Sequence, residues 1–201
     1  MTPRSRICAL ALTVLLLPVA YQEHWSTLPE KAFYLNFPQT HTYLEQPLSP
    51  SDALLQKYAE CIGWDWRLVA AVVYHESRFH EQAQSGKGAV GLMQIRSTRY
   101  PQEELLIPER NLQVGTRYLK KLQGMFPAAS PLENIKFTLA AYHLGEGRLG
   151  QLISRAREKG LNPDYWDSVG SQLPKGHHTL SYVENVLNTY DLYAKQYPPC
   201  Q

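Results

Sequence analysis

The chain has 201 residues, of which 44% are hydrophobic and 19% are charged, so it is long enough for one domain with a real core and short for two. Its formal net charge is only +2, with basic residues scattered among acidic ones, and we therefore expect no nucleic-acid partner. The 13 Tyr and 4 Trp residues suit either stacking against sugars or packing in a core.

The first 48 residues divide into two segments. Arg4 and Arg6 precede an almost unbroken apolar run over residues 7–20, which is the layout of a secretory signal. Residues 1–20 therefore predict export to the periplasm or cell envelope, with an uncleaved N-terminal anchor as the alternative. Residues 21–48 show no periodicity and contain several prolines, and we expect a linker or a tail over the domain surface.

Two cysteines, Cys61 and Cys200, remain once the leader is set aside. An oxidising compartment would permit a disulfide between them. The alternative is two unpaired thiols, with Cys61 packed in a core and Cys200 on a loose chain end. The spacing does not choose between the two.

Residues 49–201 have the helical periodicity of a folded domain. Ser49, followed by Pro50 and Asp52, predicts a helix start with Ser49 as the cap, and Gly63 predicts its end. Asp65 then predicts the cap of a second helix, which has no Gly or Pro between residues 66 and 79.

Glu76 lies on the apolar face of this second helix. The residues that share that face are Val69, Val72 and Val73. Loss of hydration there raises the pKa of a carboxyl group, as a general acid working near neutral pH requires. The alternative is a structural ion pair between Glu76 and an arginine such as Arg78 or Arg96.

A glycine-rich loop follows the helix, with glycines at 86, 88 and 91 that let the backbone turn tightly and approach a ligand. Ser85 and Gln94 flank the turn and carry groups suited to the hydroxyl and amide groups of a sugar. We expect this loop to line a cleft beside Glu76. The alternative for each of these residues is a turn or a cap.

The rest of the chain predicts further helices and no strands. A short helix or turn is expected over residues 97–106, and Asn111 is expected to cap a helix whose one face holds Leu112, Gly115, Leu119 and Leu122. Three more helices are predicted over residues 131–145, with Tyr142 near the end, over 147–160, and over 178–196, with Tyr182 on its apolar stripe. We predict a connection around residues 165–166, and an all-α fold.

A metal site is not expected. His75 and His80 flank Glu76 as in a metalloprotease helix, but they are five residues apart and so point in different directions.

The ordered motifs resemble those of the soluble lytic transglycosylases, peptidoglycan-cleaving relatives of goose-type lysozyme, over about residues 49–193. The entrance to the Glu76 helix and the start of the last helix look most like the membrane-bound type F branch. The motifs that carry the resemblance are Glu76-Ser77, Ser85, Gly91-Leu92-Met93-Gln94-Ile95 and Ala141-Tyr142 with Gly145. The resemblance implies a lysozyme-like helical fold with the glycine-rich loop lining the cleft, and residues 49–201 as the catalytic domain.

The resemblance also implies a reaction. Glu76 would act as acid and then base in cleaving the β-1,4 bond between N-acetylmuramic acid and N-acetylglucosamine, which leaves a 1,6-anhydromuramic end. Ser85 and Gln94 would hold acetamido and hydroxyl groups, and Tyr142 would order the acid. Met93 and Tyr182 would line the cleft. Peptidoglycan glycan strands are the implied partner, no cofactor is implied, and a monomer is expected.

Two alternatives to this reaction are a lysozyme-like muramidase that hydrolyses the same bond and a non-catalytic cell-wall-binding or assembly module. The hydrolase usually needs a second carboxylate, and no other acid in the sequence stands in a convincing motif. One departure from the family pattern is His143, which follows Tyr142 where an Asn is usual.

Overall fold

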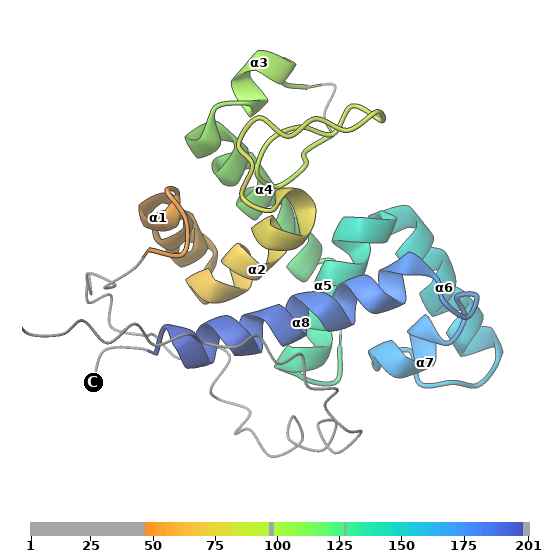
Figure 1. Ribbon diagram of the computed structural model, residues 1–201. Helices are drawn as coiled ribbons and strands as arrows, with labels where there is room; N and C mark the ends of the chain where they lie inside the picture. The colour runs from red at the N-terminus through yellow and green to blue at the C-terminus, as the bar shows by residue number, and fades with distance from the viewer. Residues whose placement is uncertain (1–46, 97–98, 127, 199–201) are drawn as a thin grey trace, which may run out of the picture.

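The computed structural model describes residues 47–96, 99–126 and 128–198 (Figure 1). The predicted leader, nearly all of the linker and Cys200 lie outside these residues. The described parts contain helices and no strand, apart from isolated bridges that pair Val90 with Gln84 and Ile95, so the all-α prediction is confirmed. The helices are α1 (Asp52–Ile62), α2 (Trp66–Ser77), α3 (Gln102–Leu105), α4 (Pro108–Gln123), α5 (Pro131–Leu144), α6 (Glu146–Glu158), α7 (Trp166–Gly170) and α8 (His178–Gln196).

Helix α1 begins two residues later than predicted from a cap at Ser49. Ser51, not Ser49, stands at the N-cap, and it makes no capping hydrogen bond with its side chain. Instead the Asp52 carboxylate accepts hydrogen bonds from the backbone N–H groups of Leu48 and Ser49, at 2.8 and 2.9 Å. A carboxylate accepts two N–H groups at once, and it therefore folds the preceding turn back onto the helix start. Gly63 ends the helix in the left-handed conformation, as predicted (φ 72°).

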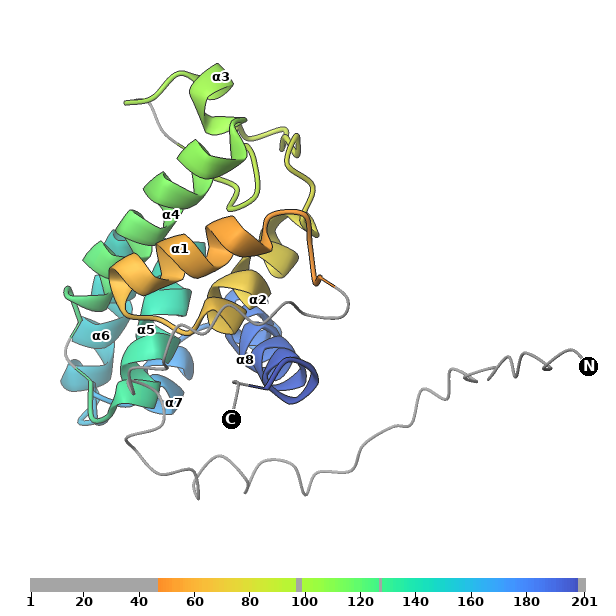
Figure 2. The same ribbon diagram turned by 90° about the vertical axis from the view of Figure 1, so that its left-hand side faces the viewer.

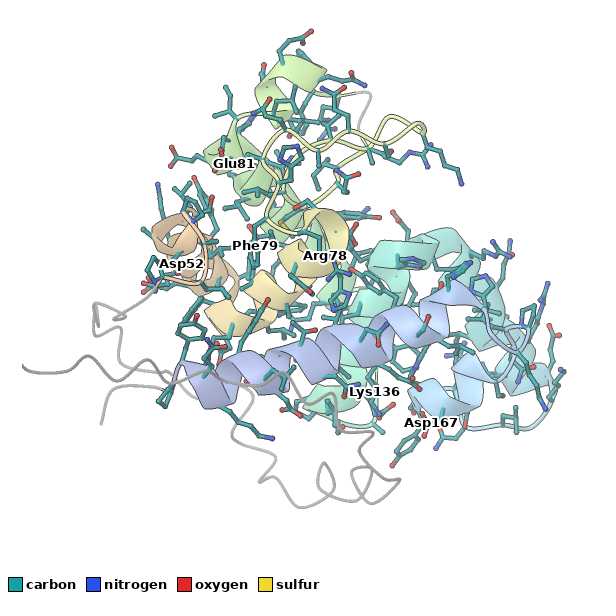
Figure 3. The ribbon with its side chains drawn as sticks, in the orientation of Figure 1. Asp52, Arg78, Phe79, Glu81, Lys136 and Asp167 are labelled. Atoms are coloured by element: carbon teal, nitrogen blue, oxygen red, sulfur yellow. The ribbon has the colours of Figure 1, made fainter. Side chains whose placement is uncertain are left out.

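Helix α2 lies at the centre of the molecule, where it packs against α1 and α8 (Figures 1 and 2). The Asp65 side chain caps it as predicted, accepting from the Arg67 N–H at 2.9 Å. The helix ends at Ser77, two residues earlier than expected. Arg78 and Phe79 both take left-handed backbone conformations, with φ of 54° and 61°, and turn the chain into the glycine-rich loop (Figure 3).

Helix α4 begins at Pro108, so the prediction that Asn111 caps it was wrong. Asn111 lies in the first turn and is fully buried, because its side chain serves the loop described below. The apolar face was predicted correctly, with Leu112, Leu119 and Leu122 fully buried. The side chain of Met93, and not another helix, packs against Gly115. A Cβ atom at position 115 would lie 2.3 Å from the Sδ atom of Met93.

The last four helices complete the fold. Helices α5 and α8 match their predicted ranges, and α5 is capped by Ser130, whose side chain accepts from the Glu133 N–H. The short helix α7 was not predicted, because five residues are too few for periodicity to show. Helix α8 crosses both α2 and α5 and packs against each of them (Figure 1). None of the described helices is long and apolar enough to cross a membrane.

Candidate active site

Glu76 lies in the last turn of α2, with its side chain partly buried. The three valines that share its face, Val69, Val72 and Val73, are fully buried as predicted. Burial raises the pKa of Glu76 to about 7, and a hydrogen bond from Tyr182 lowers it in part. A carboxyl group with this pKa exists in both protonation states near neutral pH, so it can donate a proton and then accept one.

Tyr182, on α8, provides the direct contact with the acid. Its hydroxyl donates to Oε1 of Glu76 at 2.7 Å. Burial, and then the nearby Glu76, raise the pKa of Tyr182 well above its usual value, so the hydroxyl keeps its proton. Within the described residues no group hydrogen-bonds Oε2 of Glu76, which leaves that oxygen available to carry a proton towards a ligand.

The predicted alternative of an ion pair at Glu76 is not what the structure shows. The Arg78 guanidinium lies over the ring of Tyr74, 3.9 Å from its centroid, and no arginine contributes to the pKa of Glu76. Glu76 is therefore a buried acid without a compensating cation among the described residues.

His143 and Tyr182 bring α5 and α8 together beside the acid. The two rings stack with centroids 4.5 Å apart and planes 29° apart. The Nδ1 atom of His143 lies 2.9 Å from the Thr179 hydroxyl, which holds the imidazole in that orientation. The residue that departs from the family pattern thus supports the tyrosine that contacts Glu76.

The hydroxyl of Tyr142 does not hydrogen-bond Glu76, and its predicted role in ordering the acid stays a prediction. This hydroxyl donates to the Met93 carbonyl at 2.6 Å, and the hydrogen bond to the acid comes from Tyr182 instead. Burial, and after it the charge of the nearby Glu76, raise the pKa of Tyr142 well above its usual value. Tyr142 therefore connects the glycine-rich loop to the surroundings of Glu76.

The side chain of Met93 is fully buried and packs against Gly115, so it does not line a cleft. The resemblance to the family implied that this side chain lines the cleft. The part of Met93 that faces Tyr142 is its backbone carbonyl. Any contact of Met93 with a ligand is thus limited to its backbone.

Ser85 and Gln94 both make bonds within the loop. Ser85 is exposed, and its hydroxyl accepts from the N–H groups of Lys87 and Ala89 at 3.3 and 2.9 Å. The Gln94 amide nitrogen donates to the carbonyls of Ala83 and Gly91 at 3.2 and 3.1 Å. The turn or cap alternative therefore holds for both residues, and their roles towards a substrate stay predictions.

The loop is fastened to α2 and α4 by two buried side chains that we had not assigned to the site. The Ser77 hydroxyl donates to the Leu92 carbonyl at 2.8 Å. Asn111 accepts from the Met93 N–H at 2.7 Å, and its amide nitrogen donates to two carbonyls, of Val90 and Leu105. The one available signal in the sequence is that Asn111 is a polar residue one position before the apolar face of α4, and this signal equally predicts a helix cap.

Among the loop glycines, Gly91 is under the strictest constraint. It has φ 76°, and a Cβ there would lie 2.1 Å from the Asn111 amide nitrogen and 2.6 Å from the Leu105 carbonyl oxygen. Gly88 also has positive φ, whereas Gly86 has open space and an ordinary backbone conformation. The close approach that was expected to serve a ligand serves the Asn111 anchor instead.

A cavity of about 500 Å³ is lined by residues of the loop, of α4 and of the end of α5. Gln94 and Tyr142 line it, together with Tyr118, whose ring centroid is 5.7 Å from that of Tyr142. Tyr142 is the residue that connects this cavity to Glu76, which does not itself line the cavity. The loop and α4 form most of the remaining surface.

No second carboxylate acts on Glu76 within the described residues, since burial and Tyr182 account for its pKa shift. Glu146, at the start of α6, contacts Tyr118 and Lys121, which line the cavity. Its two oxygens accept from the Tyr118 hydroxyl and pair with Lys121, and these bonds lower the pKa of Glu146 to about 2. It is therefore permanently ionised and already engaged, which makes it a poor catalytic base.

Residues 53–164, more than half of the chain, match the protein family described as Transglycosylase SLT domain. Similar proteins include two named membrane-bound lytic murein transglycosylase F. The one from Desulfosudis oleivorans is 31% identical over 79% of this chain and 39% of its own length, and the one from Cronobacter sakazakii is 37% identical over 66% and 29%. The chain thus spans less than half the length of these relatives.

Two solved structures are also similar. One is an inactive Glu-to-Gln mutant of the lytic transglycosylase Slt from Pseudomonas aeruginosa, with a TM-score of 0.59 and 26% identity over 82% of this chain and 25% of that protein. The other is the 70 kDa soluble lytic transglycosylase from Escherichia coli, with a TM-score of 0.59 and 26% identity over 74% and 24%. The fold, the ordered motifs and the family match agree, and the chain belongs to the transglycosylase SLT domain family.

Proposed function

We propose that this protein is a peptidoglycan lytic transglycosylase that cleaves the β-1,4 bond between N-acetylmuramic acid and N-acetylglucosamine. The observation that carries the proposal is Glu76, a partly buried acid with a pKa of about 7, held by Tyr182 next to a glycine-rich loop and without a partner carboxylate among the described residues. The relatives' names, which specify murein as the substrate, support the same conclusion.

The proposed reaction uses Glu76 twice. In its protonated form Glu76 gives its proton to the glycosidic oxygen, and the substrate's own 2-acetamido group stabilises the positive charge that develops at the anomeric carbon. The ionised Glu76 then takes the proton of the 6-hydroxyl as that oxygen bonds to the anomeric carbon. The product is a 1,6-anhydromuramic end, and no water or cofactor is consumed.

The remaining residues hold the substrate or the acid in this proposal. Tyr182 orients Glu76, and Tyr142 fixes the loop through the Met93 carbonyl. Gln94 and Ser85 lie in the loop that would face the acetamido and hydroxyl groups. The protein would act on glycan strands as a monomer in the periplasm or cell envelope.

The deciding experiment is digestion of purified sacculi with mass analysis of the products, for the unsubstituted protein beside Glu76→Gln. We expect anhydromuropeptides from the first and a complete loss of turnover in the second, because an amide cannot donate the proton. Products heavier by one water would identify a muramidase, and binding without cleavage would identify a non-catalytic module. Retention of more than about a tenth of the activity in Glu76→Gln would reject Glu76 as the acid.

A further inference from the structure

The cavity beside the active site has a pronounced charge. One wall is a single face of α4, because Val114, Arg117, Tyr118 and Lys121 recur at intervals of three and four residues. Arg96 and Arg99, which follow the glycine-rich loop in the sequence, also line the cavity. We call this space the basic cavity.

Four cationic side chains and no carboxylate line the basic cavity. Lys121 is already paired with Glu146 at 3.0 Å. Arg96 and Arg117 are exposed, and no carboxylate in the described residues forms an ion pair with either. Guanidinium groups present a planar fork of donors that matches a carboxylate. The cavity therefore favours an anionic ligand.

The position of the basic cavity connects that anion to the reaction. Tyr142 lines the cavity, and its hydroxyl group is close enough to Glu76 to be influenced electrostatically by that acid. A group held there would be attached to a sugar close to the cleaved bond. The volume, about 500 Å³, is large enough for a short peptide and not merely for one carboxylate.

We propose that the basic cavity binds the carboxylates of the peptide stem carried by the muramic acid next to the cleaved bond. This inference rests on the proposed function. The sugar hydroxyl and acetamido groups are uncharged, and the lactyl carboxylate is used up in the amide bond to the stem, so on an intact strand the negative charges belong to the peptide. The Tyr118 ring and Val114 offer apolar contact to the peptide between those charges.

The test compares two substrates, glycan strands with intact stems and the same strands after an amidase has removed the stems, which exposes the lactyl carboxylate. The test variant is the double substitution Arg96→Gln and Arg117→Gln. The control is Arg155→Gln with Arg157→Gln, which removes the same charge from exposed positions on α6. We expect kcat/KM on stem-bearing strands to fall about tenfold more than on stem-free strands in the test variant, mainly through KM, and to change on neither substrate in the control.

Salt provides a second readout, because exposed charge pairs are screened. The difference between the two substrates should shrink in about 0.5 M NaCl for the unsubstituted protein and change little for the double variant. An equal loss on both substrates would assign the cavity to the lactyl carboxylate or to the glycan and overturn the proposal, and so would no loss at all.

A binding measurement tests this proposal independently of the proposed catalytic function. Titration of a free stem peptide into Glu76→Gln protein needs no turnover, and we expect it to bind with an affinity that falls about tenfold when Arg96 and Arg117 are both replaced. Binding that is unaffected by the two substitutions would overturn the proposal. Absence of cleavage with the unsubstituted protein, on either substrate, would instead reject the proposed function.

Discussion

At the scale of single residues, two opposing effects set the pKa of Glu76. Burial disfavours the ionised form, and the Tyr182 hydroxyl favours it, with burial the larger effect. The result is a pKa of about 7, at which one group can serve as both acid and base. A carboxyl group in water would be ionised at neutral pH and would have no proton to give.

This balance has a consequence for stability. Because the pKa of Glu76 is raised on folding, the folded state binds more protons than the unfolded state between about pH 4.5 and pH 7, and stability falls as pH rises through that window. Glu76→Gln removes the ionisation. We expect it to raise the free energy of unfolding by about 3 kcal/mol above about pH 7, and to leave it nearly unchanged below about pH 4.5.

Urea unfolding at about pH 4 and about pH 8 measures this difference. The control is Glu158→Gln, an exposed acid at the end of α6, which should show no comparable gain at either pH. The same gain at both pH values would contradict a raised pKa at Glu76.

The pH dependence of activity tests the role of Tyr182. If Glu76 must start protonated, kcat/KM should decline above about pH 7, by about tenfold for each further pH unit. Tyr182→Phe removes a hydrogen bond that favours the ionised acid, so the pKa of Glu76 should rise and the decline should move to higher pH.

The measurement is kcat/KM against pH, and the matched control is Tyr165→Phe, at an exposed tyrosine 48% accessible to solvent. A lower activity with an unshifted profile would mean that Tyr182 is needed for packing only.

At the scale of elements, the helices follow from periodicity and the loop does not. Helices α2, α5 and α8 were predicted within about two residues, because valines, leucines and tyrosines at three and four spacing mark a buried face. The start of α1 and the role of Asn111 were misassigned, since a polar side chain near a helix start can bond to its own helix or to a distant segment, and the sequence is the same in either case.

The glycine-rich loop gives a prediction at this scale. Gly91→Ala places a Cβ against Asn111 and the Leu105 carbonyl at a positive φ, and we expect it to reduce the free energy of unfolding by about 2–4 kcal/mol. Gly86→Ala, in the same loop, meets open space and should change it by less than about 0.5 kcal/mol.

Thermal or urea unfolding of the two variants side by side provides the comparison. Equal stabilities would show that the loop relaxes around the added methyl group and that the Asn111 anchor is not rigid.

At the scale of the whole molecule, the site exists because α8 crosses α2 and α5 (Figure 1). Tyr182 is separated from Glu76 by 106 residues, and only the packing of α8 brings the two together. The positive charge of the basic cavity also depends on the tertiary structure, because Arg96 and Arg117 come from different segments of the chain and line the same cavity. The acid and the proposed stem site are thus built from segments that span most of the described chain.

Substitutions on the buried and exposed faces of α8 test how much its packing contributes to stability. Val186 is fully buried, whereas Leu192 on the same helix is 62% exposed. We expect Val186→Ala to reduce the free energy of unfolding by about 1–3 kcal/mol through lost burial and a cavity, and Leu192→Ala to change it by less than about 0.5 kcal/mol. Equal effects, measured by urea unfolding, would contradict the packing of α8 described here.

The sequence by itself determined the all-α fold, the place of Glu76 on the apolar face of α2 and its raised pKa, because helical spacing fixes which face of α2 is apolar and burial follows from that face. Only the tertiary structure decided which tyrosine holds the acid, that Met93 packs inward, that Asn111 fastens the loop, and that the arginines on two elements share a cavity. The physical reason is that a hydrogen bond or a shared cavity depends on distances between segments far apart in the chain, and local spacing carries no information about those distances.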